Sequence, residues 1–170
     1  MIRSIRRGFH GGLIAGALLC GGSGMAAAAD APSTAEVLSK LHQSDQKEIE
    51  AGKVAKKNGQ SKQVQDFGKM LIKDHADADQ KVTALAKKQK IDLPAKAAAD
   101  DTMKMAAGAD FDAKFAREML DDHKKDIAEV TEARDKTDDP KLKKLLSDIL
   151  PTLQKHEETA QKILDSQVKK

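Results

Sequence analysis

The sequence predicts an all-α protein, a four-helix bundle, and three observations lead to this fold class. Apolar residues recur at alternating spacings of three and four along four long segments, which is the pattern of helices with one buried face. Capping residues, glycines and prolines lie between those segments. No segment alternates between polar and apolar residues over a useful length, so strands are not expected. The 170 residues suit one domain with a substantial core.

The first helix is expected over about residues 34–58. It opens with Ser33 and Glu36 at the spacing of a capping box, and it ends at Asn58-Gly59, where glycine can take the left-handed conformation that closes a helix. The second helix is expected over about 61–90, where apolar residues keep the helical spacing: Val64, Phe67, Leu71, Ala78, Val82 and Leu85.

The third helix is expected over about 110–136, with Asp110 as its N-cap. The fourth is expected over about 139–168, because Asp139-Pro140 places a capping residue directly before a proline in the first helical turn. Both segments carry apolar residues on one side, which predicts that each buries one face against the others.

The connections predict a ferritin-like topology. The first two helices meet through about three residues, as do the last two, so each pair is expected to form an antiparallel hairpin. Residues 91–109 could reach about 60 Å when extended, against about 40 Å for one helix, so they can cross the whole bundle. The resulting parallel arrangement of the second and third helices agrees with an internal repeat, in which 67–75 aligns with 115–123.

Residues 1–29 differ from the rest and are predicted to be a cleaved signal peptide. Arginines precede a short Gly/Ala/Leu segment, and small residues lead up to Ala29, where cleavage would leave 30–170 as the mature domain. An apolar run this short cannot span a bilayer, so no transmembrane segment is expected in the mature chain. We therefore expect export to a bacterial periplasm. Arg6-Arg7-Gly8-Phe9 resembles part of a twin-arginine signal, but the flanking residues depart from that pattern and favour the Sec route.

The composition excludes several function classes. The net charge of +3 lies in this leader, because its three arginines have no acidic counterpart before Asp30. The balanced remainder argues against nucleic-acid binding, as does the 2% aromatic content, which provides no base-stacking platform. Cys20 also lies in the leader, so the mature chain lacks thiolate ligands, disulfides and cysteine nucleophiles.

Three histidines interrupt the apolar stripes of three helices. His75, His123 and His156 each occupy a position that the helical spacing turns inward, and residue counts place all three near the middle of the bundle. Glu48 on the first helix lies at the same height and on an inward stripe. Imidazole and carboxylate together suit one divalent transition metal, such as iron, manganese, zinc or copper. The four residues are therefore the predicted metal site.

A second interpretation needs no metal. The same side chains could form a hydrogen-bonded layer that specifies how the helices pack, which would make the chain a structural or interaction protein without a cofactor. A dinuclear oxidase site is disfavoured, since it needs glutamates three residues before two of its histidines, where this sequence has apolar side chains. No other catalytic motif is recognised, so a role other than catalysis is favoured.

Four further residues are placed outside the ligand set. His42 is near the right height, but Leu41 competes with it for the inward position. Asp79 follows His75 by one turn and could orient its ring or lie on the surface. Asp74 and Asp122 lie beside their histidines but about 100° around the helix, so they are expected to form surface or interhelical charge pairs.

The chain resembles a known bacterial family. The residues that carry the resemblance are Glu48-Ile-Glu-Ala-Gly, Val64-Gln-Asp-Phe followed by Asp74-His75, Phe111-Asp followed by Asp122-His123, and Leu150-Pro151 followed by His156. They are similar to the ferritin-like family known as domain of unknown function 4142, over about residues 34–165. The resemblance implies an exported or envelope-associated four-helix bundle of unsettled function. We therefore expect an exported bundle whose His/Glu layer binds a metal or a small ligand in storage, sensing or stress.

Overall fold

The predicted four-helix bundle is confirmed. The computed structural model describes residues 32–95 and 107–168, so the expected signal peptide lies outside the described residues. The described part contains four long helices and no strand: α1 Thr34–Asn58, α2 Lys62–Gln89, α3 Phe111–Lys136 and α4 Pro140–Val168. No helix in this part is both long and apolar enough to cross a bilayer.

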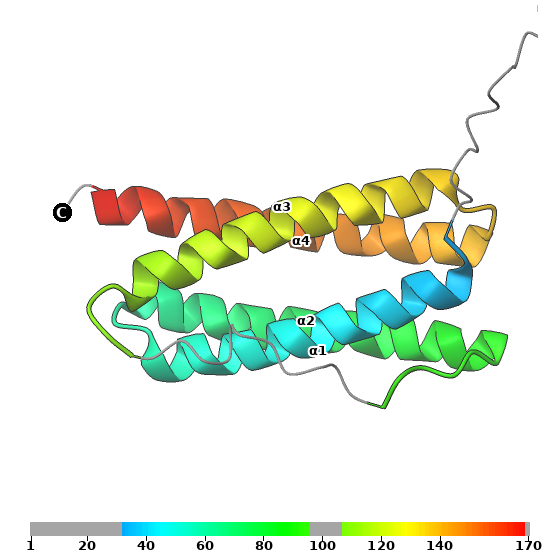
Figure 1. Cartoon of the computed structure of the whole chain (residues 1–170), viewed down its shortest axis with the longest axis horizontal. Coiled ribbons are helices and arrows are strands. Elements are labelled where there is room, and N and C mark those ends of the chain that lie inside the picture. The colour runs from blue at the N-terminus through cyan, green and yellow to red at the C-terminus, as the bar shows by residue number, and fades with distance from the viewer. Residues whose placement is uncertain (1–31, 96–106, 169–170) are drawn as a thin grey trace, which may run out of the picture.

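The helices follow the expected ferritin-like topology (Figure 1). α1 and α2 form one antiparallel hairpin, and α3 and α4 form the other. α2 ends and α3 begins at opposite ends of the bundle, so the two helices run parallel; residues 96–106 of the expected crossover lie outside the described residues. Packing between α2 and α4 and between α1 and α3 joins the hairpins, which gives the order α1, α2, α4, α3 around the core.

Side-chain caps define where three of the helices begin. Ser33 and Glu36 form the expected capping box at α1, and Ser61 accepts a hydrogen bond from the Val64 backbone at α2. The carboxylate of Asp139 accepts from the Lys141 and Leu142 backbone nitrogens at α4. These contacts supply acceptors for backbone N–H groups that have no partner within the first turn.

Two local predictions are wrong. Gly59 ends α1 with φ −57° and ψ 130°, so it is not left-handed; among the described non-glycine residues the left-handed conformation occurs at Lys90, which ends α2 with φ 58°. Asp110 makes no capping hydrogen bond at α3, because its carboxylate pairs with Lys114 instead. The neighbouring Asp112 is buried and accepts from the backbone of the α1–α2 turn, which ties that turn to the start of α3.

The core consists of two apolar clusters with a polar layer between them. One cluster joins the start of α1, the end of α2, the end of α3 and the start of α4, with Leu38, Val82 and Leu146 at its centre. The other joins the opposite halves of the same helices around Phe67 and Phe115. Between them, every helix contributes a buried ionisable side chain, and these are Asp45, Glu48, His75, His123 and His156.

A pair of glycines sets the close approach of α1 and α2. A Cβ atom on Gly68 would lie 2.6 Å from the backbone oxygen of Gly52, and one on Gly52 would lie equally close to the oxygen of Gly68. Because the obstacle is backbone, rotation of a side chain cannot relieve it. The two helices can therefore approach this closely only while both positions lack a side chain.

Substitution of Gly68 by alanine is expected to destabilise the bundle by about 1–3 kcal/mol, because the two helices must move apart to admit the methyl group. Alanine is otherwise the better helix former by about 1 kcal/mol, so a loss of stability would be due to the contact. Urea denaturation of Gly68→Ala measures the effect. Gly108→Ala is the control, since a Cβ there meets its nearest atom at an ordinary 3.5 Å. A gain of stability in Gly68→Ala would contradict the proposed tight contact.

Candidate metal centre

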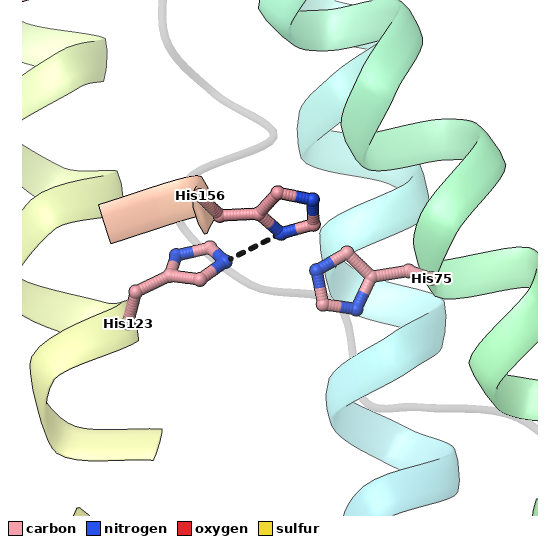
Figure 2. Close-up of side chains that lie close together, drawn as sticks. All are labelled: His75, His123 and His156. Atoms are coloured by element: carbon pink, nitrogen blue, oxygen red, sulfur yellow. Dashed lines mark hydrogen bonds between the residues drawn. The ribbon is translucent and has the colours of Figure 1, made fainter. Parts of the chain in front are cut away.

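Three buried histidines from three helices meet at the polar layer. His75 of α2, His123 of α3 and His156 of α4 are at most 3% exposed. One nitrogen from each ring lies within 4.8 Å of the corresponding nitrogens of the other two. Figure 2 shows the three rings pointing toward one another from separate helices. The structure thus brings together three of the four residues that the sequence predicted, in a group that could hold a metal ion.

The tautomer of His123 follows from its backbone contact. Its Nδ1 lies 2.8 Å from the carbonyl oxygen of Met119, one helical turn earlier. A carbonyl oxygen only accepts, so Nδ1 carries the proton and donates it. In a neutral ring, Nε2 is then unprotonated and presents a lone pair toward the centre. A metal ligand needs this arrangement.

His156 lies between His123 and a carboxylate. Its Nδ1 is 3.1 Å from Nε2 of His123, and its Nε2 is 3.2 Å from Oδ2 of Asp74 on α2. Although burial raises the pKa of Asp74, the contacts with His156 and Lys73 outweigh it and hold that pKa below its ordinary value. Both neighbours of the His156 ring are therefore acceptors, while a neutral imidazole has one proton to donate. One of the two contacts lacks a proton unless something else binds a ring nitrogen.

His75 completes the group with a nitrogen that has no partner. Its Nδ1 is 2.8 Å from Oδ1 of Asp45 on α1, while its Nε2 is buried and makes no hydrogen bond to any described residue. Figure 2 shows a ring nitrogen of His75 directed toward the other two rings. Because Nδ1 faces Asp45, this inward atom is Nε2. A buried polar atom without a partner costs about 1–3 kcal/mol, so its position calls for an explanation.

The three rings share one pattern of contacts. The outer nitrogen of each ring faces an acceptor, either a backbone carbonyl or an aspartate, and the inner nitrogens face one another. Histidines that bind metals usually donate their second N–H to a carbonyl or carboxylate, which leaves a lone pair for the ion. In this respect the site has the contacts of a three-imidazole metal centre.

Burial keeps the imidazoles neutral. It lowers the pKa of His75 to about 4, of His123 to about 3 and of His156 to about 4, and in His123 and His156 the neighbouring imidazoles lower it further. Neutral rings are the form that coordinates a metal at neutral pH. Burial also raises the pKa of Asp45 to about 8, with Asp79 and Asp126 adding repulsion. A cation at the centre would offset the burial cost of the Asp45 carboxylate.

Glu48 lies outside this group. It is 5% exposed, its Oε2 has no hydrogen-bond partner among the described residues, and burial raises its pKa well above the ordinary value. It lines a small cavity of about 170 Å³ between α1 and α3 that none of the three histidines lines. The α1 carboxylate that contacts a histidine is instead Asp45, one turn earlier.

The sequence interpretation missed the buried face of α1 and the partners of two aspartates. His42 is buried, whereas Leu41 is only partly buried, so the expected inward stripe of α1 is rotated. The ring of His42 binds Asp79, which therefore orients His42 rather than His75. Asp74 forms an interhelical contact as expected, but with a site histidine. Asp45 lies three residues before Glu48 and Ser44 four residues before it, so helical spacing alone does not distinguish the two faces.

Comparison with known proteins agrees with the resemblance seen in the sequence. The model of the family described as "Domain of unknown function (DUF4142)" matches residues 22–163, and the chain belongs to this family. No curated protein and no solved structure matches the chain. The description of the family assigns no activity, so functional inference rests on the geometry of the site.

The depressed pKa of His123 predicts a pH dependence of stability in the metal-free protein. Its folded value of about 3 lies below the ordinary 6.5, so between these values the unfolded chain binds a proton that the folded chain does not. Neutral His123 makes its full contribution to the free energy of unfolding above pH 6.5. Below that value the free energy of unfolding falls by roughly 1.4 kcal/mol per pH unit until about pH 3. Urea denaturation with a chelator should show the parent losing on the order of 2 kcal/mol relative to His123→Leu between about pH 6.5 and 5. Parallel profiles of the two proteins would contradict a buried neutral His123.

Proposed function

We propose that this member of the DUF4142 family is an exported bundle that binds one divalent transition-metal ion through His75, His123 and His156. The observation that carries the proposal is the set of three inward nitrogens, each on a ring whose outer nitrogen faces an acceptor. A bound ion would give the unpartnered Nε2 of His75 a partner. It would also free the single proton of His156 for the contact with Asp74.

The spacing of the rings fits one ion after a small adjustment. Tetrahedral coordination at about 2.0–2.1 Å places ligand nitrogens about 3.4 Å apart. The nitrogens of His123 and His156 are already 3.1 Å apart, and the remaining separations are no larger than 4.8 Å. A side-chain movement of about 1 Å would therefore close the site, which is small compared with the freedom of a histidine ring.

The donor set narrows the choice of metal. With Glu48 outside the group, the protein ligands are all imidazole nitrogens, which suit zinc, copper and iron better than manganese. Three protein ligands also leave a coordination position for water or a small ligand, as in metal sites that exchange ligands. This combination supports a role in metal storage, sensing or stress.

The metal proposal predicts which histidines are needed. Purified chain, stripped with a chelator and titrated separately with zinc, copper and ferrous iron, should bind one equivalent of at least one of them. The free energy of unfolding should also rise by about 2.7 kcal/mol when the free metal concentration is a hundredfold above Kd. His75→Ala, His123→Ala and His156→Ala should each lose stoichiometric binding. Elemental analysis and thermal denaturation provide the measurements.

Two matched variants control for loss of a buried polar group. His42→Ala removes a buried histidine whose ring contacts lie outside the centre, and Glu48→Gln replaces a buried carboxyl group that is not part of the three-histidine group. Both should retain one equivalent of metal. If the parent binds no metal and shows no thermal shift, the polar layer serves packing alone and the chain is a structural or interaction protein.

We propose export because residues 1–29 have the pattern of a signal peptide, and this proposal predicts the N-terminus of the mature chain. In bacteria that express the full chain, the periplasmic protein should begin at Asp30, because the small residues Ala27 and Ala29 suit signal-peptide cleavage. Replacing both alanines with leucine should block processing and leave the precursor uncleaved. N-terminal sequencing of periplasmic and cytosolic fractions distinguishes the outcomes. An uncleaved parent chain found in the cytosol would refute the proposal.

A further inference from the structure

One cavity in the described part of the chain leads from the surface to His75, one of the three histidines of the candidate centre. It encloses about 280 Å³ among the four helices, and His75 and its partner Asp45 lie in its wall. Both are more than nine-tenths buried, and each has one polar atom without a partner, Nε2 of His75 and Oδ2 of Asp45. The two other described cavities have no histidine in their walls. This cavity therefore reaches the candidate centre at His75.

The wall of the cavity is acidic. Its acidic side chains come from all four helices, and they outnumber the lysines, which are Lys40, Lys73 and Lys81. The acids lie at different depths: Asp77, Glu129 and Asp148 are exposed at the rim, and Asp74 and Asp126 are partly buried. Asp45 is buried, and because its pKa is about 8 it carries little of the negative charge at neutral pH. A cleft lined mainly by one sign of charge, with low-dielectric walls, concentrates ions of the opposite sign.

The volume suits a hydrated ion. About six waters at roughly 30 Å³ each occupy about 180 Å³, which is less than the cavity provides. A divalent cation could thus enter with its water shell and exchange waters for the imidazoles at the inner end. Asp126 lies along this path, held by a hydrogen bond from the Ser44 hydroxyl to its Oδ2.

We infer that this acidic cavity is the access path by which a hydrated divalent cation reaches His75, His123 and His156, and that its rim carboxylates accelerate uptake. The inference rests on the proposed metal site and adds the route and the residues that control the rate. It assigns Glu129 and Asp148 a role in steering the ion, without placing them among its ligands.

Stopped-flow mixing of the metal-free chain with Co²⁺, followed by its visible absorption, measures the association rate. Glu129→Gln/Asp148→Asn should lower the rate constant about tenfold at low ionic strength, with one equivalent still bound at saturation. The difference should shrink as salt is raised, because exposed charges are screened over about 10 Å at 0.1 M. Lys40→Gln/Lys81→Gln, which removes positive charge from the same wall, should raise the rate.

The control is a double variant that removes two carboxylates outside the cavity. Glu129 and Asp148 each pair with a lysine four residues earlier, and Glu132 and Asp66 each pair with a lysine four residues away while lying outside this cavity. Glu132→Gln/Asp66→Asn should therefore leave the rate unchanged. Equal slowing by both double variants, or by neither, overturns the access path while the metal site stands. A parent chain that binds no Co²⁺, zinc, copper or iron overturns the metal site itself.

Discussion

The burial of histidines in the middle of an apolar core is the constraint on which this structure depends. Each ring must find hydrogen-bond partners where water is excluded, and it finds them on neighbouring helices. His123 of α3 contacts His156 of α4, His156 contacts Asp74 of α2, and the adjacent His75 contacts Asp45 of α1. This chain of contacts follows the order of the helices around the core. A shift of any helix by one turn would break a contact and leave a buried polar group unpaired, so the layer sets their register.

This layer has a cost that packing alone does not justify. It divides the apolar core into two clusters, and it leaves buried polar atoms of Asp45, Glu48 and His75 without partners among the described residues. A well-packed apolar layer of similar volume would often be as stable or more stable. If helix register were the only purpose, a fully paired layer would serve it better. The unpaired atoms therefore favour a site that is completed by a ligand over a layer that is complete in itself.

Part of this arrangement could be predicted from the sequence and part could not. His75, His123 and His156 could be placed because each lies in an unambiguous apolar stripe. The buried face of α1 could not be predicted, because two stripes follow helical spacing equally well: Leu41-Ser44-Glu48 and His42-Asp45-Glu48. Packing against α2 distinguishes them, because Gly52 lies seven residues after Asp45, on the same face of α1, and sits against Gly68. The contact of Asp74 with His156 could not be predicted for a related reason: Asp74 is turned away from the core on its own helix, but α4 packs against that side.

Different features of the sequence determine the topology of this bundle and the side chains available as metal ligands. The ferritin-like order of helices follows from connection lengths, whereas a dinuclear site in such a bundle depends on glutamates three residues before its histidines. Here those positions are Ile72, Leu120 and Leu153, which supply no oxygen ligand; Leu120 and Leu153 are buried in the apolar core, and Ile72 is partly buried. The group that could hold an ion consists of three imidazoles, and the carboxylates of Asp45 and Asp74 contact the outer nitrogens of His75 and His156. Such a site can hold one ion and keep a position open, but it lacks the bridging carboxylates that would hold two.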